Sequence, residues 1–318
     1  MAKSRFVKIL GVVLALLLLL TTNQFGPAGI LLAQTGAETK TLAKQITFLA
    51  DPEIRESSGL VLSQRNDNCF WTHNDSGDAP RLFLVHRDGR TIARLKIAGA
   101  KALDWEDIAF ATINGTPKLI IGDIGGNAFK RDYVTLYVLP EPKFPFDDSK
   151  PTQPIESVAT VETAIDVVFK GGVTNYEGIA VDHSAKSILI FEKSFTGRVY
   201  SIPLPDSTKK RIEVEAKYIG QTGIPFASAC DIAKDNKSMV VINYGTGFLF
   251  LRRTAANGHI EEWSESFKRE PVLFVLPKMR QSEAVCFSKD SKSIFLTSEQ
   301  VLTPLIQMTL PVDVAIGR

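Results

Sequence analysis

The residues of this chain best suited to chemistry are carboxylates that stand just before β-forming runs. Asp104, Glu106 and Asp107 lie within the stretch DWED, and the run IAFA follows at once. Like charges held within about 4–6 Å raise one another's pKa or require a counter-ion. Clusters of carboxylate oxygens suit hard cations. We therefore predict a divalent-cation site, with Ca²⁺ expected first and Mg²⁺ or Mn²⁺ as alternatives.

Similar passages recur along the chain, and each is followed 13–17 residues later by a second polar group. A simpler interpretation stays open, in which the acids line a hydrated channel and are only solvated. If the site is catalytic, the participants expected are His73, Asp75, Asp107 and Lys193. The expected metal ligands are the acidic residues of both groups: Glu106, Asp123, Glu177, Glu192, Glu283 and Glu299.

The sequence does not support a serine-hydrolase site. The chain has four histidines and contains no G-x-S-x-G motif. His73 is the one histidine that the repeat pattern places near the carboxylates. Catalysis would therefore depend on carboxylates, a metal, and His73 or Lys193.

The elements that must position these residues form a fivefold repeat. Each acidic passage is followed by a polar tip and a second β-rich run, which is the pattern of a hairpin. Successive copies are separated by 48, 71, 53 and 53 residues. Periods near 50 with several short strands in each indicate a β-propeller. The five passages begin at Glu56, Asp104, Asn175, Ser228 and Gln281.

We predict an all-β fold, a β-propeller of five four-stranded blades. In this architecture the loops before the first strands share one face with the loops after the second strands, so both polar groups surround one mouth. A Pro-rich insertion from Leu139 to Glu156 explains the long separation and is expected to be an external loop. Six blades are the alternative, because the insertion could hide a degenerate blade.

The amino-terminal region is expected to contribute one strand and a targeting segment. The fifth repeat ends at Arg318 without an outer strand, and KQITFLA (44–50) can supply it and close the ring. Ahead of it, three basic residues precede an apolar run from Ile9 to Leu20, the plan of a secretory signal. We expect a signal peptide or uncleaved anchor at 1–34, a linker at 35–43, and a single domain at 44–318.

Composition excludes several classes of protein. Without residues 1–34 the chain has 34 Lys and Arg against 35 Asp and Glu, which argues against a nucleic-acid binder. Cys69, Cys230 and Cys286 are too few and too scattered for a disulfide scaffold or a zinc site, and are expected to be buried. We expect a secreted or periplasmic monomer whose partner is a small molecule or an envelope protein. Membrane contact is expected only through an uncleaved amino-terminal segment.

The motifs HNDSGD (73–78), DWEDIA (104–109), GDIGGN (122–127), YEGIA (176–180) and QSEAVCFS (281–288) together resemble a group of secreted bacterial β-propellers. The chain is also more distantly similar to the SdiA-regulated and the phytase-like esterase propellers. The resemblance covers about residues 45–315 and implies a propeller with a cation-binding funnel. The phytase motifs do not match residue by residue, and Ser58 and Cys230 interrupt the series of glutamates. The phytase activity is therefore not carried over.

Two functions follow as expectations. The first is a secreted, metal-dependent hydrolase of phosphate esters, lactones or similar small molecules. The second is a non-catalytic propeller that binds a ligand or an envelope protein. A cation with an open coordination position would favour the hydrolase, because catalytic metal sites keep one position free.

Overall fold

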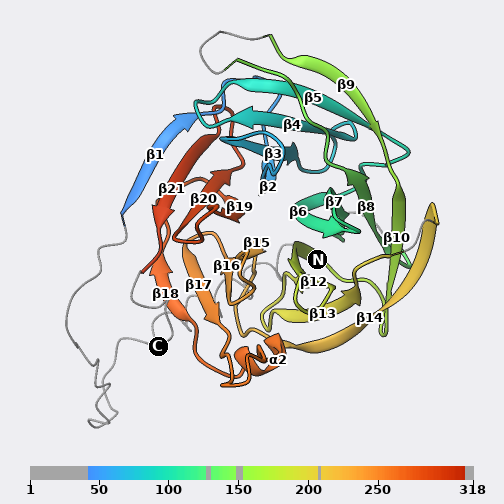
Figure 1. The fold of residues 1–318 in the computed structure, drawn as a ribbon, viewed down its shortest axis with the longest axis vertical. Coiled ribbons are helices and arrows are strands. Elements are labelled where there is room, and N and C mark those ends of the chain that lie inside the picture. Colours follow the sequence, from blue (N-terminus) through green and yellow to red (C-terminus); the bar gives the residue numbers. More distant parts are fainter. Residues whose placement is uncertain (1–41, 127–129, 148–152, 207–208, 312–318) are drawn as a thin grey trace, which may run out of the picture. The chain divides into compact units, whose positions relative to one another are not determined.

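The regular secondary structure of the described part of the chain is almost all β-strand, which confirms the all-β prediction (Figure 1). The computed structural model describes residues 42–126, 130–147, 153–206 and 209–311. Chain contacts separate Met1–Glu38 from Thr39–Arg318, and all described residues belong to the second unit. The predicted signal or anchor at 1–34 lies outside the described residues.

The strands form four hydrogen-bonded sheets that contain five repeats of similar order. The first repeat comprises β2 (Ser57–Leu62), β3 (Cys69–Asn74), β4 (Arg81–His86), β5 (Thr91–Ala98) and the added β9 (Ile155–Thr160). The second comprises β6 (Trp105–Ile113), β7 (Thr116–Asp123), β8 (Val134–Pro140) and β10 (Thr163–Phe169). The third comprises β11 (Tyr176–Asp182), β12 (Ser187–Glu192), β13 (Arg198–Pro203) and β14 (Arg211–Gln221).

The last two repeats are separate four-stranded sheets. The fourth comprises β15 (Ala229–Ile232), β16 (Ser238–Ile242), β17 (Thr246–Leu251) and β18 (Val272–Val275), with the short helix α2 (Trp263–Ser266) between the last two strands. The fifth comprises β19 (Ser282–Phe287), β20 (Ser293–Ser298), β21 (Pro304–Thr309) and β1 (Ala43–Phe48).

The five repeats are arranged in a ring, with their first strands innermost (Figure 1). Each first strand packs against the first strands of both neighbours, in the closed cycle β2, β6, β11, β15, β19 and back to β2. Five hydrophobic clusters fill the interfaces, one between each pair of neighbouring repeats. The buried apolar side chains therefore stabilise the ring all the way round.

Turn chemistry explains where the first hairpin of each repeat reverses. In the second repeat the loop is the dipeptide Asn114-Gly115, with φ values of 50° and 73°, which is the favoured two-residue hairpin connection. The other four tips also contain one residue with positive φ, namely Asn68, Lys186, Asn236 and Ser291. The polar tips identified in the sequence are thus real turns.

The amino-terminal strand closes the ring as predicted. β1 pairs antiparallel with β21, from Ala43 opposite Met308 to Phe48 opposite Pro304. It is therefore the outer strand that the fifth repeat lacks in its own sequence.

The inserted segment after β8 does not behave as the external loop that we predicted. Glu141 and Phe144 are buried, the Trp71 indole donates to the Glu141 carboxylate at 2.9 Å, and the Phe144 ring packs edge-on against Trp71. The segment then forms β9, which pairs in parallel with β5. The first repeat therefore has five strands instead of four, and the described residues contain no sixth repeat.

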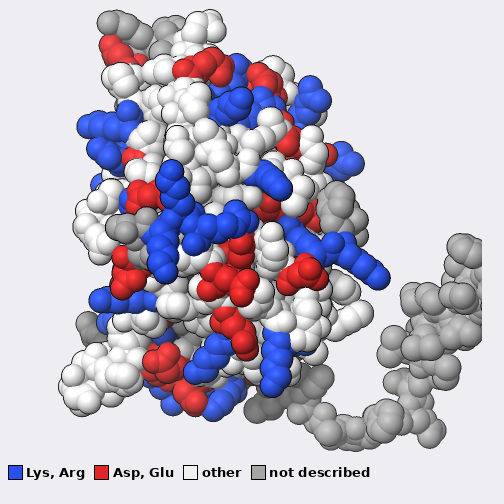
Figure 2. All heavy atoms as spheres, turned by 90° about the vertical axis from the view of Figure 1, so that its right-hand side faces the viewer, with Lys and Arg blue, Asp and Glu red and all other residues white. Residues whose placement is uncertain are grey.

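The outermost strands β9 and β14 face solvent, whereas β5 and β10 beneath them are mostly buried. β14 alternates exposed and partly buried residues, and it pairs in parallel with β10, joining the second and third repeats into one eight-stranded sheet. Figure 2 shows the side of the molecule on which β9 and β14 lie, with Lys and Arg interspersed among Asp and Glu. This side thus has no continuous field of one sign.

Candidate metal centre

Matched β-bulges set the positions of the acidic residues. Four of the five first hairpins shift register by one residue at the same place, between Ser57 and Gly59 in the first repeat and at the equivalent positions in three others. A bulge leaves one residue unpaired and redirects its side chain. The fourth repeat pairs without a shift there, with Cys230 opposite Val241. The four bulge residues are Ser58, Glu106, Glu177 and Glu283.

A second set of residues lies just after the second strands. In the same four repeats, the first residue of this loop donates its backbone N–H to the carbonyl two residues before the bulge, at 2.9–3.2 Å. This bond holds the loop against the start of the first strand. The donors are Asp75, Ile124, Lys193 and Glu299, and the acceptors are Glu56, Asp104, Asn175 and Gln281.

Three of these carboxylates lie close enough to share one ion. Asp75, Asp104 and Glu106 each offer an oxygen, and the three oxygens lie within 4.8 Å of one another. Gly125 packs against this group, and a Cβ at that position would overlap with the Glu106 and Asp104 carboxylates. The GDIGGN motif therefore supplies a glycine where the loop backbone must approach two acids.

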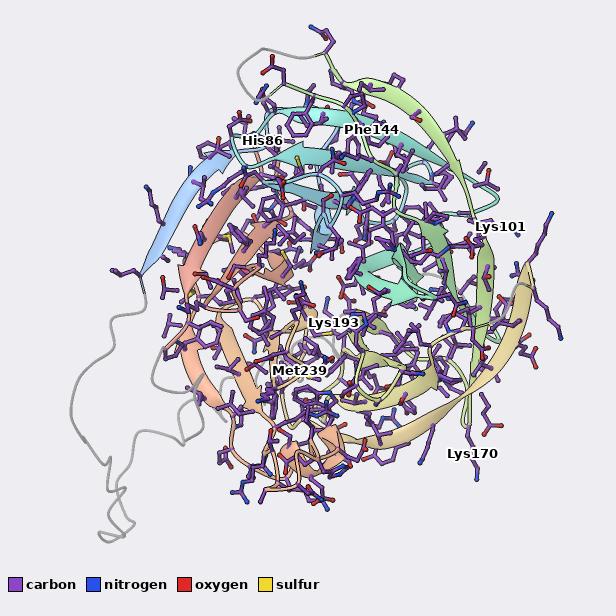
Figure 3. All side chains as sticks on the ribbon, viewed as in Figure 1. His86, Lys101, Phe144, Lys170, Lys193 and Met239 are labelled. Carbon is purple, nitrogen blue, oxygen red and sulfur yellow. The ribbon has the colours of Figure 1, made fainter. Side chains whose placement is uncertain are left out.

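The other side of the mouth contains one cation among acids. The Lys193 ammonium lies 3.1 Å from Glu177 Oε2 and 3.9 Å from Glu283 Oε1, and donates to Tyr244 Oη at 3.1 Å. Gln281 Nε2 donates to the carboxylates of Glu299 at 2.6 Å and Glu283 at 3.3 Å. Figure 3 places Lys193 close to the centre of the ring.

We refer to Asp75, Asp104, Glu106, Glu177, Glu283 and Glu299, with Lys193, as the acidic cluster. Burial, and then repulsion from Asp104 and Glu283, raises the pKa of Asp75 to about 6. Burial also raises the pKa of Glu177 to about 7, with Lys193 opposing the change. Burial and Glu283 raise the pKa of Glu299 to about 9.

Glu106 and Lys193 show the same imbalance of charge. Burial, followed by repulsion from Glu177 and Asp75, raises the pKa of Glu106 well above its ordinary value. Burial alone would lower the pKa of Lys193, but its acidic neighbours raise it. The cluster therefore contains more negative charge than one ammonium can balance.

The structure does not bring His73 to the acidic cluster. The histidine is fully buried, and its ring lies edge-on to Trp105 at 5.6 Å. It pairs with Gly59, which follows the bulge residue Ser58, so it lies two residues deeper in the strand pair than Asp75. Burial lowers the pKa of His73 to about 4. The expected location of His73 at the mouth is therefore corrected.

Asp107 likewise lies outside the acidic cluster, and its carboxylate connects two neighbouring first strands. Its carboxylate accepts the backbone N–H groups of Ile108 at 2.8 Å and Ile179 at 2.9 Å, and burial raises its pKa. Asp231 makes the same pair of bonds, to Ile232 and Phe287. Each carboxylate thus joins its own first strand to the first strand of the next repeat.

Two expected metal ligands are occupied elsewhere. Asp123 accepts the Asp104 N–H at 3.1 Å and an Arg131 guanidinium hydrogen bond at 2.8 Å. Glu192 accepts hydrogen bonds from Arg198 Nε and Nη2, each at 2.6 Å. Burial alone would raise the pKa of Glu192, but the bonds to Arg198 lower it. Each of the two is the last residue of its second strand and anchors a loop at the mouth. The position that faces the acidic cluster is the next residue along the chain.

Sequence reasoning missed Gly125, Tyr244 and Gln281, and did not include Asp104 among the expected metal ligands. The repeat alignment contains a signal for two of them. Gln281 and Asp104 both stand two residues before a glutamate at a bulge, at matched positions. Tyr244 has no comparable signal, because the preceding strand pair lacks the bulge.

Exposed aromatic residues lie on the same face as the acidic cluster. Phe195 is 76% exposed and packs edge-on against Phe226 at 4.7 Å. Phe226 has a φ of 54°, an unusual conformation for a bulky residue, and its N–H donates to the Ser194 carbonyl. Tyr244, which contacts Lys193, is also exposed. Large apolar side chains are thus displayed beside the charged centre.

Comparison with models of known protein families gave no match, and a search of curated proteins also gave none. Within the described ranges, no helix has both the length and the apolar character needed to cross a membrane.

Proposed function

We propose that the five repeats are the blades of a five-bladed β-propeller and that its mouth binds a divalent cation. The closed cycle of first strands and the single hydrophobic cluster at each interface support the propeller. The added strand β9 and the parallel pairing of β10 with β14 are then elaborations on the outside of the ring.

The observation that supports the cation site best is the convergence of Asp75, Asp104 and Glu106. Two oxygen ligands of one Ca²⁺ ion are separated by at most about 5 Å, because each lies about 2.3–2.6 Å from the ion. The oxygens of the three residues lie within 4.8 Å of one another, which fits this limit. Carboxylate oxygens favour Ca²⁺, with Mg²⁺ and Mn²⁺ as weaker candidates.

A cation held by these three residues would bind an oxygen of a small-molecule ligand at the mouth. Three carboxylates provide fewer ligands than Ca²⁺ takes, so water or a ligand oxygen completes the coordination. Such an ion polarises a phosphoryl or carbonyl oxygen and lowers the pKa of a bound water, which is the chemistry needed to hydrolyse phosphate esters or lactones. Lys193 and Glu177, which form an ion pair at 3.1 Å and both act on the charge of Glu106, are groups of this chain that could hold or move a proton there.

Calorimetry tests the cation site directly. Chelator-treated protein is titrated with CaCl₂, MgCl₂ and MnCl₂, as wild type, Glu106→Gln and Asp104→Asn. We expect both variants to weaken Ca²⁺ binding at least about tenfold, because each removes a charged ligand. Glu192→Gln is the matched control, because Glu192 is equally buried but its carboxylate binds Arg198. Absence of binding by wild type, or equal binding by all variants, would refute the proposal.

A second function is favoured by the aromatic residues of the same face. Phe195, Phe226 and Tyr244 are exposed beside the acidic cluster, as expected for a surface that binds another protein. The double variant Phe195→Ser/Phe226→Ser separates the two functions. It should leave cation binding unchanged if the mouth acts only on small molecules.

A further inference from the structure

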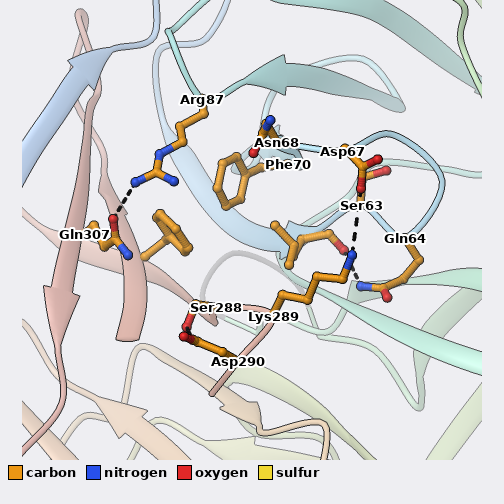
Figure 4. A pocket seen from close by; sticks show the side chains of 12 residues that line it. Ser63, Gln64, Asp67, Asn68, Phe70, Arg87, Ser288, Lys289, Asp290 and Gln307 are labelled. Atoms are coloured by element: carbon orange, nitrogen blue, oxygen red, sulfur yellow. Dashed lines mark hydrogen bonds and ion pairs between the residues drawn. The ribbon is translucent and has the colours of Figure 1, made fainter. Parts of the chain in front are cut away.

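A large cleft lies on the face opposite the acidic cluster, where the first and fifth repeats meet (Figure 4). Its volume is about 710 Å³, within the range of small-molecule sites. The walls come from the tips of the β2–β3 and β19–β20 hairpins, from the β4–β5 turn and from β21. The cleft therefore forms only when the ring is closed.

The Arg87 guanidinium lies in this cleft and is held in one orientation by its neighbours. Its guanidinium donates to Gln307 Oε1 at 2.6 Å and lies over the Phe295 ring at 5.7 Å. No ion pair joins Arg87 to a carboxylate within the described part of the chain. A planar guanidinium that is already oriented and still has donors to offer suits a carboxylate or a phosphate.

A second cation faces the same space. Figure 4 shows Lys289 approaching the pocket from the side opposite Arg87. Its ammonium lies 3.8 Å from Asp67, but both side chains are more than three-quarters exposed, so the pair is weak and screened. The other acid of the lining, Asp290, accepts hydrogen bonds from Ser288 Oγ and the Lys292 N–H. Its carboxylate is thus already used within its own turn.

The floor of the cleft is aromatic. Phe70 and Phe295 both line it, with their rings edge-on at 4.7 Å. The two side chains are only 1% and 4% exposed, so they close the floor of the cleft and offer a ligand little ring surface. A neighbouring 540 Å³ hollow shares Asn68 and Arg87 with the cleft, so space continues beyond the guanidinium.

We propose that this cleft is a second ligand site, which binds a small organic anion. Its carboxylate or phosphate is bound by Arg87 and Lys289. The site is independent of the cation site, since it lies on the other face and shares no residue with it.

Ligand-observed NMR with three matched probes tests this site. Benzoate and phenyl phosphate carry the two anionic groups, and benzamide has the same ring without the charge. We expect both anions to bind, benzamide to bind at least about tenfold more weakly, and Arg87→Gln to reduce anion affinity to the level of benzamide. The stronger of the two anions identifies the charged group for which the site is built.

Two further variants test the hydrogen bond that orients Arg87 and the folding of the protein. Gln307→Ala keeps the Arg87 guanidinium but removes this hydrogen bond, so we expect an intermediate loss of anion affinity. Arg253→Gln, an exposed arginine in the fourth repeat, is the control and should bind like wild type. The proposal is overturned if no probe gives a saturable signal, if benzamide binds as well as benzoate, or if Arg87→Gln and Gln307→Ala both bind like wild type.

Discussion

In the presence of a chelator, the acidic cluster should cost this protein stability as the pH rises from about 4 to 8. Asp75 and Glu177 in this cluster have raised pKa values. A carboxyl group with a raised native pKa binds its proton more tightly in the folded state than in the unfolded state. Its contribution to stability is therefore complete below the unfolded pKa and is lost as the pH passes the folded pKa.

The size of the effect follows from the shifts. The pKa of Asp75 rises from 3.8 to about 6, and that of Glu177 from 4.5 to about 7. Each shift of about 2 units corresponds to about 3 kcal/mol. The two groups belong to one repelling cluster, so their contributions overlap and we expect about 3–5 kcal/mol in total. For a domain of this size, a loss of 3 kcal/mol lowers the thermal midpoint by about 6–12 °C.

Differential scanning calorimetry between pH 4.5 and 8.5, with chelator or with excess CaCl₂, measures this effect. The difference between the two midpoints cancels the contribution of His73, which opposes that of the carboxylates because its pKa is lowered. We expect the midpoint in chelator to fall relative to the midpoint in Ca²⁺ as the pH rises, because the ion replaces the missing positive charge. A difference that does not grow over this range would show that the carboxylates do not destabilise one another.

Two glutamate variants should respond with opposite signs in the same chelator buffer at pH 8. Glu106→Gln removes one charge from the acidic cluster, so it should raise the thermal midpoint while abolishing the gain from Ca²⁺. Glu192→Gln breaks the bond to Arg198, so it should cost about 1–3 kcal/mol. Equal destabilisation by both variants would mean that Glu106 has a purely structural role.

The remaining predictions concern a glycine and a buried ion pair. Gly125→Ala should weaken Ca²⁺ binding by about 10- to 100-fold in calorimetry, because its methyl group would displace two acids, whereas Gly245→Ala, with open space around it, should not. Asp182→Asn should lower the free energy of unfolding by about 3–5 kcal/mol in urea at pH 7, because the buried Arg252 guanidinium at 2.7 Å loses its counter-ion. A decrease in the free energy of unfolding below about 1 kcal/mol would show that Asp182 is not the counter-ion that stabilises Arg252.

The sequence predicts the fold well where structure is local. Hairpin tips such as Asn114-Gly115 depend on the backbone preferences of a few residues, so they can be recognised directly. The pairing of β1 with β21 follows from counting strands per repeat. The parallel pairing of β5 with β9 could not be predicted, because it depends on how the inserted segment is fixed by Glu141 and Phe144. Nothing in a Pro-rich stretch identifies those two residues as buried.

The candidate site was predictable in its first strands and only partly after its second strands. Glu106 occupies the bulge position that the repeat alignment indicates. Asp75, Lys193 and Glu299 were expected at the site and belong to the acidic cluster. Asp123 and Glu192 lie one residue too early, because the bulge that sets the register is not visible in the sequence. A shift of one residue reverses the face to which a side chain points.

The two interruptions in the glutamate series have different structural causes. Ser58 stands at a bulge, and its hydroxyl donates to the Glu106 carbonyl at 2.9 Å, so it supports the neighbouring acid. Cys230 stands on a strand without a bulge and is buried against Gly178, where a glycine leaves room for the sulfur. The side chain of Ser58 is therefore directed as those of the glutamates are, and that of Cys230 is not.

This difference explains how a crowded acidic cluster can persist in a stable ring. The bulges redirect only the residues at the mouth, while the next layer of first strands is joined by Asp107 and Asp231 through backbone N–H groups of the following repeat. Below that layer, apolar clusters fill every interface. Repulsion between carboxylates at the mouth therefore acts on bulged strand ends. Beneath them, the Asp107 and Asp231 hydrogen bonds at two of the five interfaces and the apolar clusters at all five hold the first strands together.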